Sequence, residues 1–210
     1  MYTPSHFKME ELAEIQEFIK AHSFGILFSQ TDQGPTGTHL PFYLVEAEGE
    51  YGVLYGHMAR ANPHWKSTAQ DVLVVLAGPH HYISPTWYQA PDNVPTWNYT
   101  AVHAYGQIEI FEEREALLEL LDRSTDFFEA GMPKPWKMAE SQEYAERILG
   151  GIVGFKIVLT KLEGKQKLNQ NKSPQLQQNV IDGLRAQENS QAHAVAELME
   201  ERAAKKTAKE

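Results

Sequence analysis

The residues best placed to do chemistry lie in one stretch, residues 54–66, with the sequence LYGHMARANPHWK. The stretch begins as the end of an apolar strand, passes Gly56, and enters a short helix that Asn62 and Pro63 open. Such a junction collects backbone N–H groups that lack intrahelical partners, and an anion can accept hydrogen bonds from them. Arg60 lies in the turn, and its planar guanidinium can hold a phosphate through two bonds. The stretch therefore predicts a phosphate site, and the alternative is an ordinary junction with a solvated arginine.

The nine histidines raise the question of a metal site. His80 and His81 are adjacent, and His39 and His103 lie in other predicted strands. Neighbouring residues of an extended chain point to opposite faces, so His80 and His81 cannot chelate one ion together. Metal-binding histidines recur instead at spacings that place them on one face, with further converging ligands. We therefore predict no metal site.

The signatures of several enzyme classes are missing from the sequence. The chain has no cysteine, which excludes disulfides and thiol chemistry. It has no Gly-x-Ser-x-Gly nucleophile elbow, no Gly-x-Gly-x-x-Gly loop and no Walker-type loop. Catalytic residues therefore stay unknown at this level.

Composition limits the possible partners. A formal net charge of −9 over 210 residues argues against a surface that is a nucleic-acid footprint as a whole. The longest apolar run, residues 72–77, is far too short to span a bilayer. The chain opens without a charged-then-apolar leader, so we expect a cytoplasmic protein that does not enter a membrane.

Short strands joined by tight turns dominate the hydrophobic pattern. We expect strands over residues 24–30, 38–45, 51–57, 72–88, 97–111 and 152–162, and helices over 8–22, 112–129, 141–149 and from 174 onward. The 31–37 segment reads as a turn, and Pro41 predicts an edge strand or a bulge. Such an order favours an antiparallel sheet over βαβ units. We predict one α+β, mainly β, barrel domain over residues 1–187 and a helical tail over 188–210.

The charge balance reverses near the end of the domain. The segment from Lys156 to Lys172 contains five lysines and only one glutamate. Lysines 161, 165, 167 and 172 could form a solvated face, hold a ligand phosphate or contact a DNA backbone. The sequence shows no helix-turn-helix, zinc-finger or basic-zipper pattern that would favour the DNA alternative.

Four ordered motifs resemble those of the PaiB family. They are GHMARANPHW at 56–65, GPHHYISPTWY at 78–88, VPTWNY at 94–99 with VHAYG at 102–106, and KQKLNQN at 165–171. The opening MYTP with Phe7 also matches, and the resemblance extends from residue 1 to about residue 184. The family is described as FMN-binding negative transcriptional regulators. The resemblance implies an antiparallel split β-barrel like that of pyridoxamine-phosphate oxidases, and a homodimer with a flavin in each cleft between subunits.

The resemblance also implies the residues that hold FMN. The phosphate would lie on the turn from His57 to Arg60, and the polar ring edge on residues 38–41. The basic segment would reach the flavin from the partner subunit, and two aromatic residues would cover the ring. The implied cofactor-binding residues are Thr38, His39, Leu40, His57, Met58, Ala59, Arg60, Asn62, Trp97, Tyr99, Lys167, Gln170 and Asn171.

These features favour a flavin-binding regulator over an enzyme. The resemblance implies a negative transcriptional regulator, or a flavin-responsive regulator that acts through DNA or a regulatory protein partner. The substrate-gripping residues of the oxidases are not identifiable here, so catalysis is not implied. Three alternatives stay open: an FMN-dependent oxidoreductase with a nicotinamide donor, a haem-binding split barrel, and a dimeric scaffold with an empty cleft.

Overall fold

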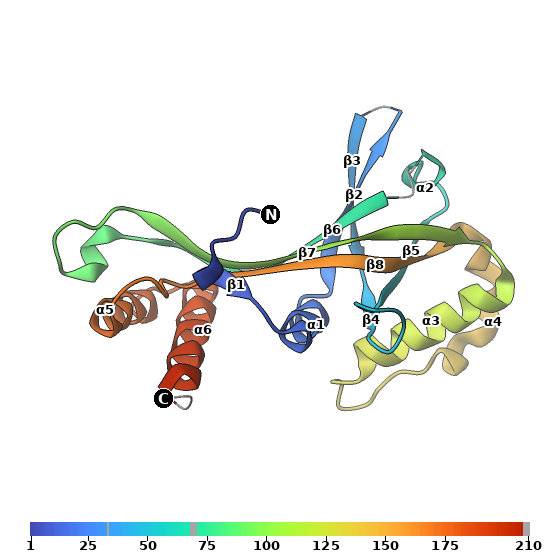
Figure 1. Ribbon diagram of the computed structural model, residues 1–210. Helices are drawn as coiled ribbons and strands as arrows, with labels where there is room; N and C mark the ends of the chain where they lie inside the picture. Colours follow the sequence, from blue (N-terminus) through green and yellow to red (C-terminus); the bar gives the residue numbers. More distant parts are fainter. Residues whose placement is uncertain (33, 68–70, 208–210) are drawn as a thin grey trace. The chain divides into compact units, whose positions relative to one another are not determined.

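The computed structural model describes residues 1–32, 34–67 and 71–207 (Figure 1). Its strands are β1 (Lys8–Met9), β2 (Phe24–Thr31), β3 (Gly34–Pro41), β4 (Tyr43–Val45), β5 (Val53–Ala59), β6 (Asp71–Ile83), β7 (Thr96–Phe111) and β8 (Ile152–Lys167). Its α-helices are α1 (Leu12–Ala21), α2 (His64–Ser67), α3 (Arg114–Glu129), α4 (Gln142–Ile148), α5 (Pro174–Arg185) and α6 (Ser190–Thr207). The 3₁₀ turns are η1 (Ser5–Phe7), η2 (Pro85–Tyr88), η3 (Met138–Ser141) and η4 (Leu149–Gly151).

The described chain divides into two compact units. The barrel unit comprises Gln16–Leu76 and His103–Leu162. The helical unit comprises Met1–Ile15, Ala77–Val102 and Glu163–Glu210. The long strands β6, β7 and β8 are each divided between these units, which are described separately below.

The barrel unit is formed by a sheet whose two edge strands follow each other in the chain. The strand order is β3-β2-β6-β7-β8-β5-β4, and β3 runs through the single residue Phe42 into β4. The pairs β2–β3, β2–β6, β4–β5 and β5–β8 are all antiparallel. β5, the neighbour of β4, also approaches the end of β3, since a Cβ added to Gly56 of β5 would lie 3.0 Å from the Pro41 carbonyl oxygen. Pro41 therefore ends an edge strand, as its missing N–H predicts.

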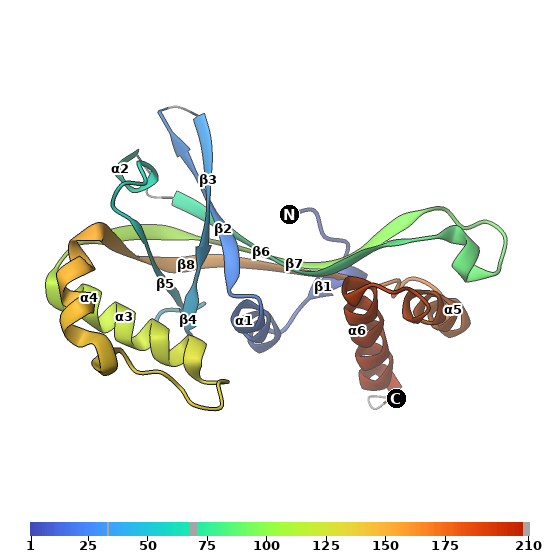
Figure 2. The same cartoon turned by 180° about the vertical axis from the view of Figure 1, so that it is seen from behind.

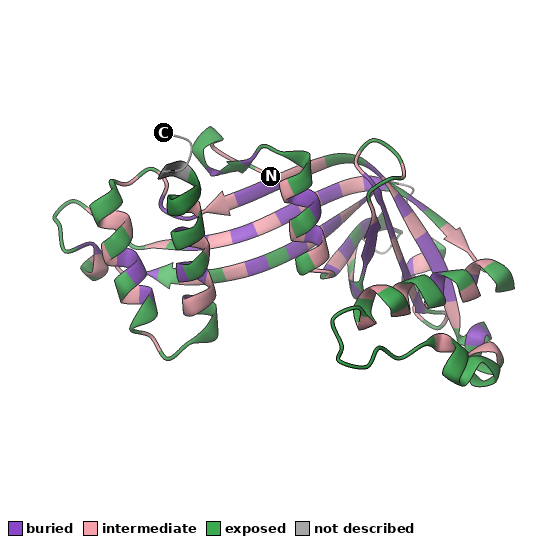
Figure 3. Ribbon diagram, turned by 90° about the horizontal axis from the view of Figure 1, so that it is seen from below, coloured by how far each residue is buried: buried purple, intermediate pink, exposed green. Residues whose placement is uncertain are grey.

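Alternating burial along the strands forms the interior of the barrel unit, and the same alternation is visible in Figure 3. Side chains of one strand point alternately to its two faces, so every second residue enters the core. Helix α3 covers part of the barrel with Leu117 and Leu120, which pack with Tyr43 and Leu149. The core is thus completed by a helix close to the range that the sequence predicts, 112–129.

The helical unit has its own hydrophobic core. Helices α5 and α6 lie side by side (Figure 2) and pack over the ends of the long strands. The buried residues of this core are Ile83, Tyr88, Leu168, Val180, Ile181, Leu184, Ala192, Val195, Ala196 and Met199. Polar contacts join α6 to two strands: Gln191 accepts from the His80 N–H of β6 at 3.2 Å, and Arg202 donates to Gln166 of β8 at 2.8 Å. The C-terminal helix therefore packs on its own chain.

Several segments differ from their sequence-based boundaries. The strand expected over 72–88 ends at Ile83 and is followed by the turn η2, and Phe42 divides the strand expected over 38–45 between β3 and β4. The turn expected over 31–37 is shorter, because β2 reaches Thr31 and pairs with Gly34, whose φ is 103°. β8 extends to Lys167 because β1 pairs with its polar end through Lys8–Lys165. Residues 8 and 9 are therefore a strand instead of the helix start that periodicity predicts.

The tail boundary at residue 188 stays a prediction, and residues 208–210 of that tail lie outside the described residues. Within the described ranges, each helix is too short or too polar to cross a lipid bilayer.

Packing of α5 against η2 makes a stability prediction. A Cβ added to Gly183 would lie 2.5 Å from Trp87 Cγ, so alanine at this position would force the indole or the helix to move. We expect Gly183→Ala to lower the free energy of unfolding by about 1–3 kcal/mol, the usual cost of overpacking a core. Urea unfolding followed by circular dichroism measures this, with Gly131→Ala as control because a Cβ there meets no atom within 4 Å. Equal stability of the two variants would contradict the packing described.

Candidate functional site

The turn after β5 is shaped by hydrogen bonds to its own backbone. The Asn62 N–H donates to the Ala59 carbonyl at 2.9 Å, which reverses the chain. Asn62 Oδ1 then accepts from the His64 N–H at 3.0 Å, which caps the first turn of α2. Pro63 occupies the first position after this cap, where a missing N–H costs nothing. The sequence signal for a helix start at Asn62 and Pro63 is therefore realised locally.

A buried imidazole joins this turn to the β2–β3 hairpin. His64 is 2% exposed. Its Nδ1 lies 2.7 Å from Thr38 Oγ1, and its Nε2 lies 2.7 Å from Ser29 Oγ. Asn62 Nδ2 adds a longer bond to Thr38 Oγ1 at 3.4 Å. Two predicted site residues, Thr38 and Asn62, are thus brought together by His64.

Sequence reasoning missed both His64 and Ser29 as site residues. A signal for His64 was present, since it lies in the GHMARANPHW motif directly after the helix-opening Asn-Pro pair. No comparable signal marks Ser29, which looks like any residue of an alternating strand. Its role depends on strand register, which places it near a residue 35 positions later.

Burial keeps the histidines of this region neutral. Desolvation lowers the pKa of His64 below its usual value of 6.5, and it lowers the pKa of His57 in the same direction. A neutral imidazole has one donor and one acceptor nitrogen. A hydroxyl can donate or accept, so Ser29 and Thr38 can satisfy either tautomer of His64.

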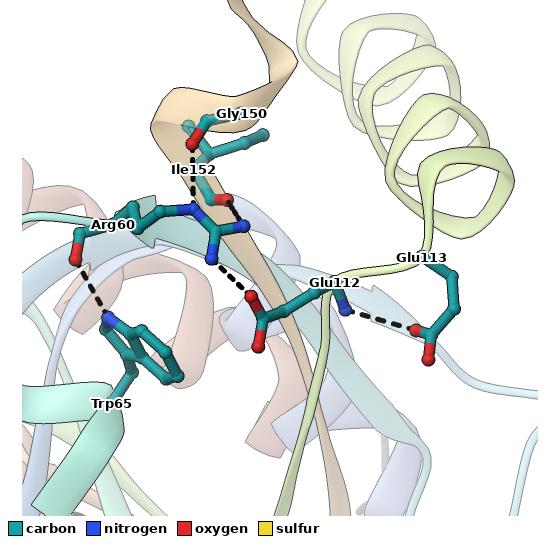
Figure 4. Close-up of polar contacts among 6 residues, drawn as sticks. All are labelled: Arg60, Trp65, Glu112, Glu113, Gly150 and Ile152. Atoms are coloured by element: carbon teal, nitrogen blue, oxygen red, sulfur yellow. Dashed lines mark hydrogen bonds and ion pairs between the residues drawn. The ribbon is translucent and has the colours of Figure 1, made fainter.

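Arg60 connects the turn to residues 150–152 and to Glu112 (Figure 4). Its Nε donates to the Gly150 carbonyl at 2.7 Å, its Nη2 donates to the Ile152 carbonyl at 3.1 Å, and its Nη1 pairs with Glu112. The backbone takes part as well, because the Arg60 N–H donates to the Gly151 carbonyl and the Arg60 carbonyl accepts from Trp65 Nε1. A phosphate bound to Arg60 would therefore either share the guanidinium with the Glu112 carboxylate or displace that carboxylate.

The other predicted residues of the barrel unit lie on β3 and β5, near the same turn. Leu40 and Met58 are buried and belong to the core. The imidazole of His39 stacks on Phe24 at a ring distance of 6.2 Å, and Ala59 is exposed at the end of β5. That Leu40, Met58 and His39 contact a flavin stays a prediction.

The predicted aromatic and basic residues belong to the helical unit. Trp97 is 52% exposed and, together with Tyr99 and His80, lines a cavity of about 390 Å³ whose other walls are the small residues Ala77, Gly78, Thr100 and Ala101. Lys167 Nζ donates to the Trp97 carbonyl at 2.7 Å and also contacts Thr96 Oγ1. A second cation is close, because Lys165 Nζ lies 5.0 Å from the centre of the Tyr99 ring. The cavity, called the aromatic slot below, is thus lined by aromatic and small residues, and one lysine lies near each of Trp97 and Tyr99.

The last two predicted residues have different surroundings. Gln170 Oε1 accepts from the Leu168 N–H at 2.7 Å, so this side chain folds back on its own loop. Asn171 is exposed. The neighbouring Asn169 was missed by sequence reasoning. It is buried, has a φ of 62°, and its side-chain amide donates to the Tyr88 hydroxyl at 3.0 Å.

The donor set suits FMN. The barrel unit offers hydroxyl, amide and guanidinium donors around one turn, which is what a phosphate needs. The helical unit offers an aromatic slot with small residues, which is what an isoalloxazine ring needs. In the described part of the chain, His, Asp and Glu side chains do not gather in any group of three or more that could hold a metal ion.

The buried histidines predict a dependence of stability on pH. In the unfolded chain His64 takes up a proton near its usual pKa of 6.5, whereas the folded protein resists this because burial lowers the pKa. The unfolded state therefore binds more protons below about pH 6.5, and stability present above that pH is lost as pH falls. One such group contributes a slope of at most about 1.4 kcal/mol per pH unit.

Urea unfolding at intervals between pH 7.5 and about pH 5 measures this loss. His64→Gln should flatten the profile, and His57→Gln and His22→Gln serve as comparisons because burial lowers the pKa of those groups too. A His64→Gln profile parallel to that of the wild-type protein would contradict this, because it would show that the pKa of His64 is the same in the folded and unfolded states.

The sequence of this chain is similar to a family model and to several known proteins. A family model described as "Putative FMN-binding domain" matches residues 1–161. A Bacillus subtilis (strain 168) protein named Protease synthase and sporulation protein PAI 2 is 41% identical over 207 residues, covering 96% of this chain and 98% of that protein. The uncharacterized protein YKL070W of Saccharomyces cerevisiae is 31% identical over 159 residues, covering 64% of this chain and 94% of that protein.

Solved structures with low sequence identity share the fold. A conserved hypothetical protein, Rv2991, from Mycobacterium tuberculosis has a TM-score of 0.58 at 18% identity, covering 83% of this chain and 94% of that chain. The flavocytochrome Anf3 from Azotobacter vinelandii has a TM-score of 0.56 at 15% identity, covering 76% and 69%. The predicted antiparallel split β-barrel with flanking helices and a C-terminal helical segment is thereby confirmed. By sequence, the chain belongs to the PaiB family of FMN-binding-domain proteins.

Proposed function

We propose that this protein binds FMN without a covalent bond and acts in the cytoplasm as a flavin-responsive negative regulator of transcription. The family model over residues 1–161 supports the cofactor. The observation that carries the proposal is the polar turn after β5, which brings Asn62 within hydrogen-bond distance of Thr38 and contains Arg60 two positions earlier in the chain. The regulatory role rests on the name of the B. subtilis relative, which refers to protease synthesis and sporulation.

In this proposal the turn holds the phosphate end of FMN. Asn62, Arg60 and the backbone from His57 to Ala59 would face the phosphate, and residues 38–40 would face the polar edge of the ring. His64 would keep Thr38 and Asn62 in place, because its imidazole already bonds to Thr38 and its N–H to Asn62. FMN, when bound, supplies the redox chemistry of its isoalloxazine ring.

The aromatic slot would come from the partner subunit of a homodimer. Trp97, Tyr99 and Lys167 lie in the helical unit, together with Gln170 and Asn171. Trp97 exposes 52% of its surface, which is unusual for the largest apolar side chain and is expected of a residue that meets a ligand or a partner. A regulatory contact with DNA or with a protein would be made by such a dimer.

Haem is a second candidate ligand for the slot. His80 lines it, and the Nδ1 of His80 lies 3.3 Å from the Gly78 carbonyl, which orients the imidazole. A histidine in an apolar slot is the arrangement that binds haem iron in many proteins. The further alternative, an FMN-dependent oxidoreductase, predicts that the purified protein with FMN oxidises a reduced nicotinamide.

Arg60 gives the sharpest test of the phosphate site. We expect Arg60→Ala to weaken FMN binding by about 1.5–3 kcal/mol, the range for a charge-assisted hydrogen bond, or about ten- to a hundredfold in Kd. Glu112→Ala is the matched control, because it removes the same ion pair but keeps the cation. It should leave the affinity unchanged or raise it, since a competing carboxylate is gone.

Titration followed by quenching of flavin fluorescence measures both affinities. Equal losses in the two variants would assign Arg60 a structural role only. A wild-type protein that ignores FMN but gains a haem absorption band, lost in His80→Ala, would replace the flavin proposal by the haem alternative.

The dimer makes a separate prediction. If Trp97 and Lys167 reach the flavin of the partner subunit, dilution to monomer must release FMN. Sedimentation velocity with detection at a flavin wavelength follows both quantities at once. Trp97→Ala should weaken FMN binding in the dimer, with Trp136→Ala as a control of similar exposure on another element. Flavin that sediments with a monomer would contradict the shared site.

A further inference from the structure

A cavity of about 320 Å³ lies between α3 and the barrel, away from the turn that carries the proposed phosphate site. All of its walls belong to the barrel unit. They are Tyr43, Tyr55, Glu109, Ile110, Phe111, Ala116, Glu119, Leu120, Arg123 and Lys156. Its volume is at the lower end of the range for small-molecule sites.

Two tyrosines form an aromatic wall of this cavity. Tyr43 and Tyr55 are direct partners in the β4–β5 pair, and their rings stack at 5.3 Å with an angle of 17°. The guanidinium of Arg123 lies over both rings, 5.9 Å from the centre of Tyr43 and 5.7 Å from that of Tyr55. A cation is attracted to aromatic faces in this geometry. The stacked pair is therefore a cation site that the protein fills with its own side chain.

Two carboxylates complete the surroundings of the guanidinium. Glu48 lies 3.8 Å from Nη2 of Arg123, and Glu119 lies 3.5 Å from Nη1. These distances exceed the roughly 2.7–2.9 Å of a charge-assisted hydrogen bond, so Arg123 is held loosely. Its side chain is 41% exposed and has room to turn into solvent.

We propose that this cavity binds a small organic cation, an amine or guanidine with a short hydrocarbon body, whose head group replaces the Arg123 guanidinium over Tyr43 and Tyr55. The head group would then lie between Glu48 and Glu119. Ile110, Ala116 and Leu120 would cover its hydrocarbon part.

The hydrogen bond of Tyr55 supports the cage. The Tyr55 hydroxyl donates to Glu48 at 2.6 Å. Burial, together with this bond, raises the pKa of Tyr55 to about 12, so the phenol stays protonated and neutral. Glu48 is thus held beside the rings as an acceptor, where it can also meet a ligand cation.

The charge balance favours a cation over an anion. Glu109 and Lys156 pair with each other at 3.0 Å on another wall and cancel. The remaining charged groups are Arg123 and the carboxylates Glu48 and Glu119. An anion would have to displace both carboxylates from one cation, whereas a cation only has to replace one loosely held side chain.

Calorimetric titration of the whole protein with propylguanidinium chloride and with propylammonium chloride tests the proposal. We expect both probes to bind the wild-type protein, and Arg123→Ala to bind them at least about tenfold more tightly because the internal competitor is gone. Arg147→Ala, which removes an exposed arginine over the single ring of Tyr144, is the matched control and should bind like wild type. Sodium propionate should not bind.

A second variant keeps the test independent of Arg123. The double change Glu48→Gln and Glu119→Gln should weaken binding of both cations about tenfold or more, because it removes the charges that attract the head group. Binding that is no tighter in Arg123→Ala than in wild type would overturn the proposal, and so would binding of propionate in place of the cations.

Discussion

The candidate site depends most on the hydrogen bonds of the buried His64. Its two ring nitrogens meet Thr38 on β3 and Ser29 on β2, while its backbone N–H is capped by Asn62. These bonds hold the turn after β5 against the β2–β3 hairpin. A buried hydrogen-bond network of this kind is costly to leave incomplete, because each unpaired polar atom forfeits its solvation. These bonds therefore favour the observed arrangement of the turn, in which Thr38 and Asn62 lie within hydrogen-bond distance of each other.

Arg60 shows how one residue can serve the fold and the proposed ligand at once. Its guanidinium joins the turn to the backbone at Gly150 and Ile152 and to Glu112 (Figure 4). These bonds hold the turn in addition to those of His64. A phosphate would exchange with Glu112, whose side chain is 46% exposed, while the carbonyl contacts could persist. The phosphate site and the stability of the turn are thus coupled through one side chain.

Much of the fold follows from local patterns, and most of the site does not. Alternating residues and turn signals predict the strands, and Asn62–Pro63 predicts the start of α2. The polar end of β8 escapes such reasoning because its pairing with β1 joins residues about 155 positions apart. Thr38 and Asn62 were found through family resemblance, whereas Ser29 was not, since its role arises only from tertiary register. Loose packing beneath α3, which leaves a cavity beside Tyr43 and Tyr55, likewise has no sequence signature.

The most direct test of the central claim is ¹⁵N NMR of the histidine side chains before and after addition of FMN. If the turn held by His64 carries the phosphate, the His64 ring signals must shift on binding, because Thr38 and Asn62 would then share their hydrogen bonds with the ligand. Inorganic phosphate should move the same signals in the same direction. Bound FMN that leaves the His64 signals unchanged would place the phosphate elsewhere and contradict the account.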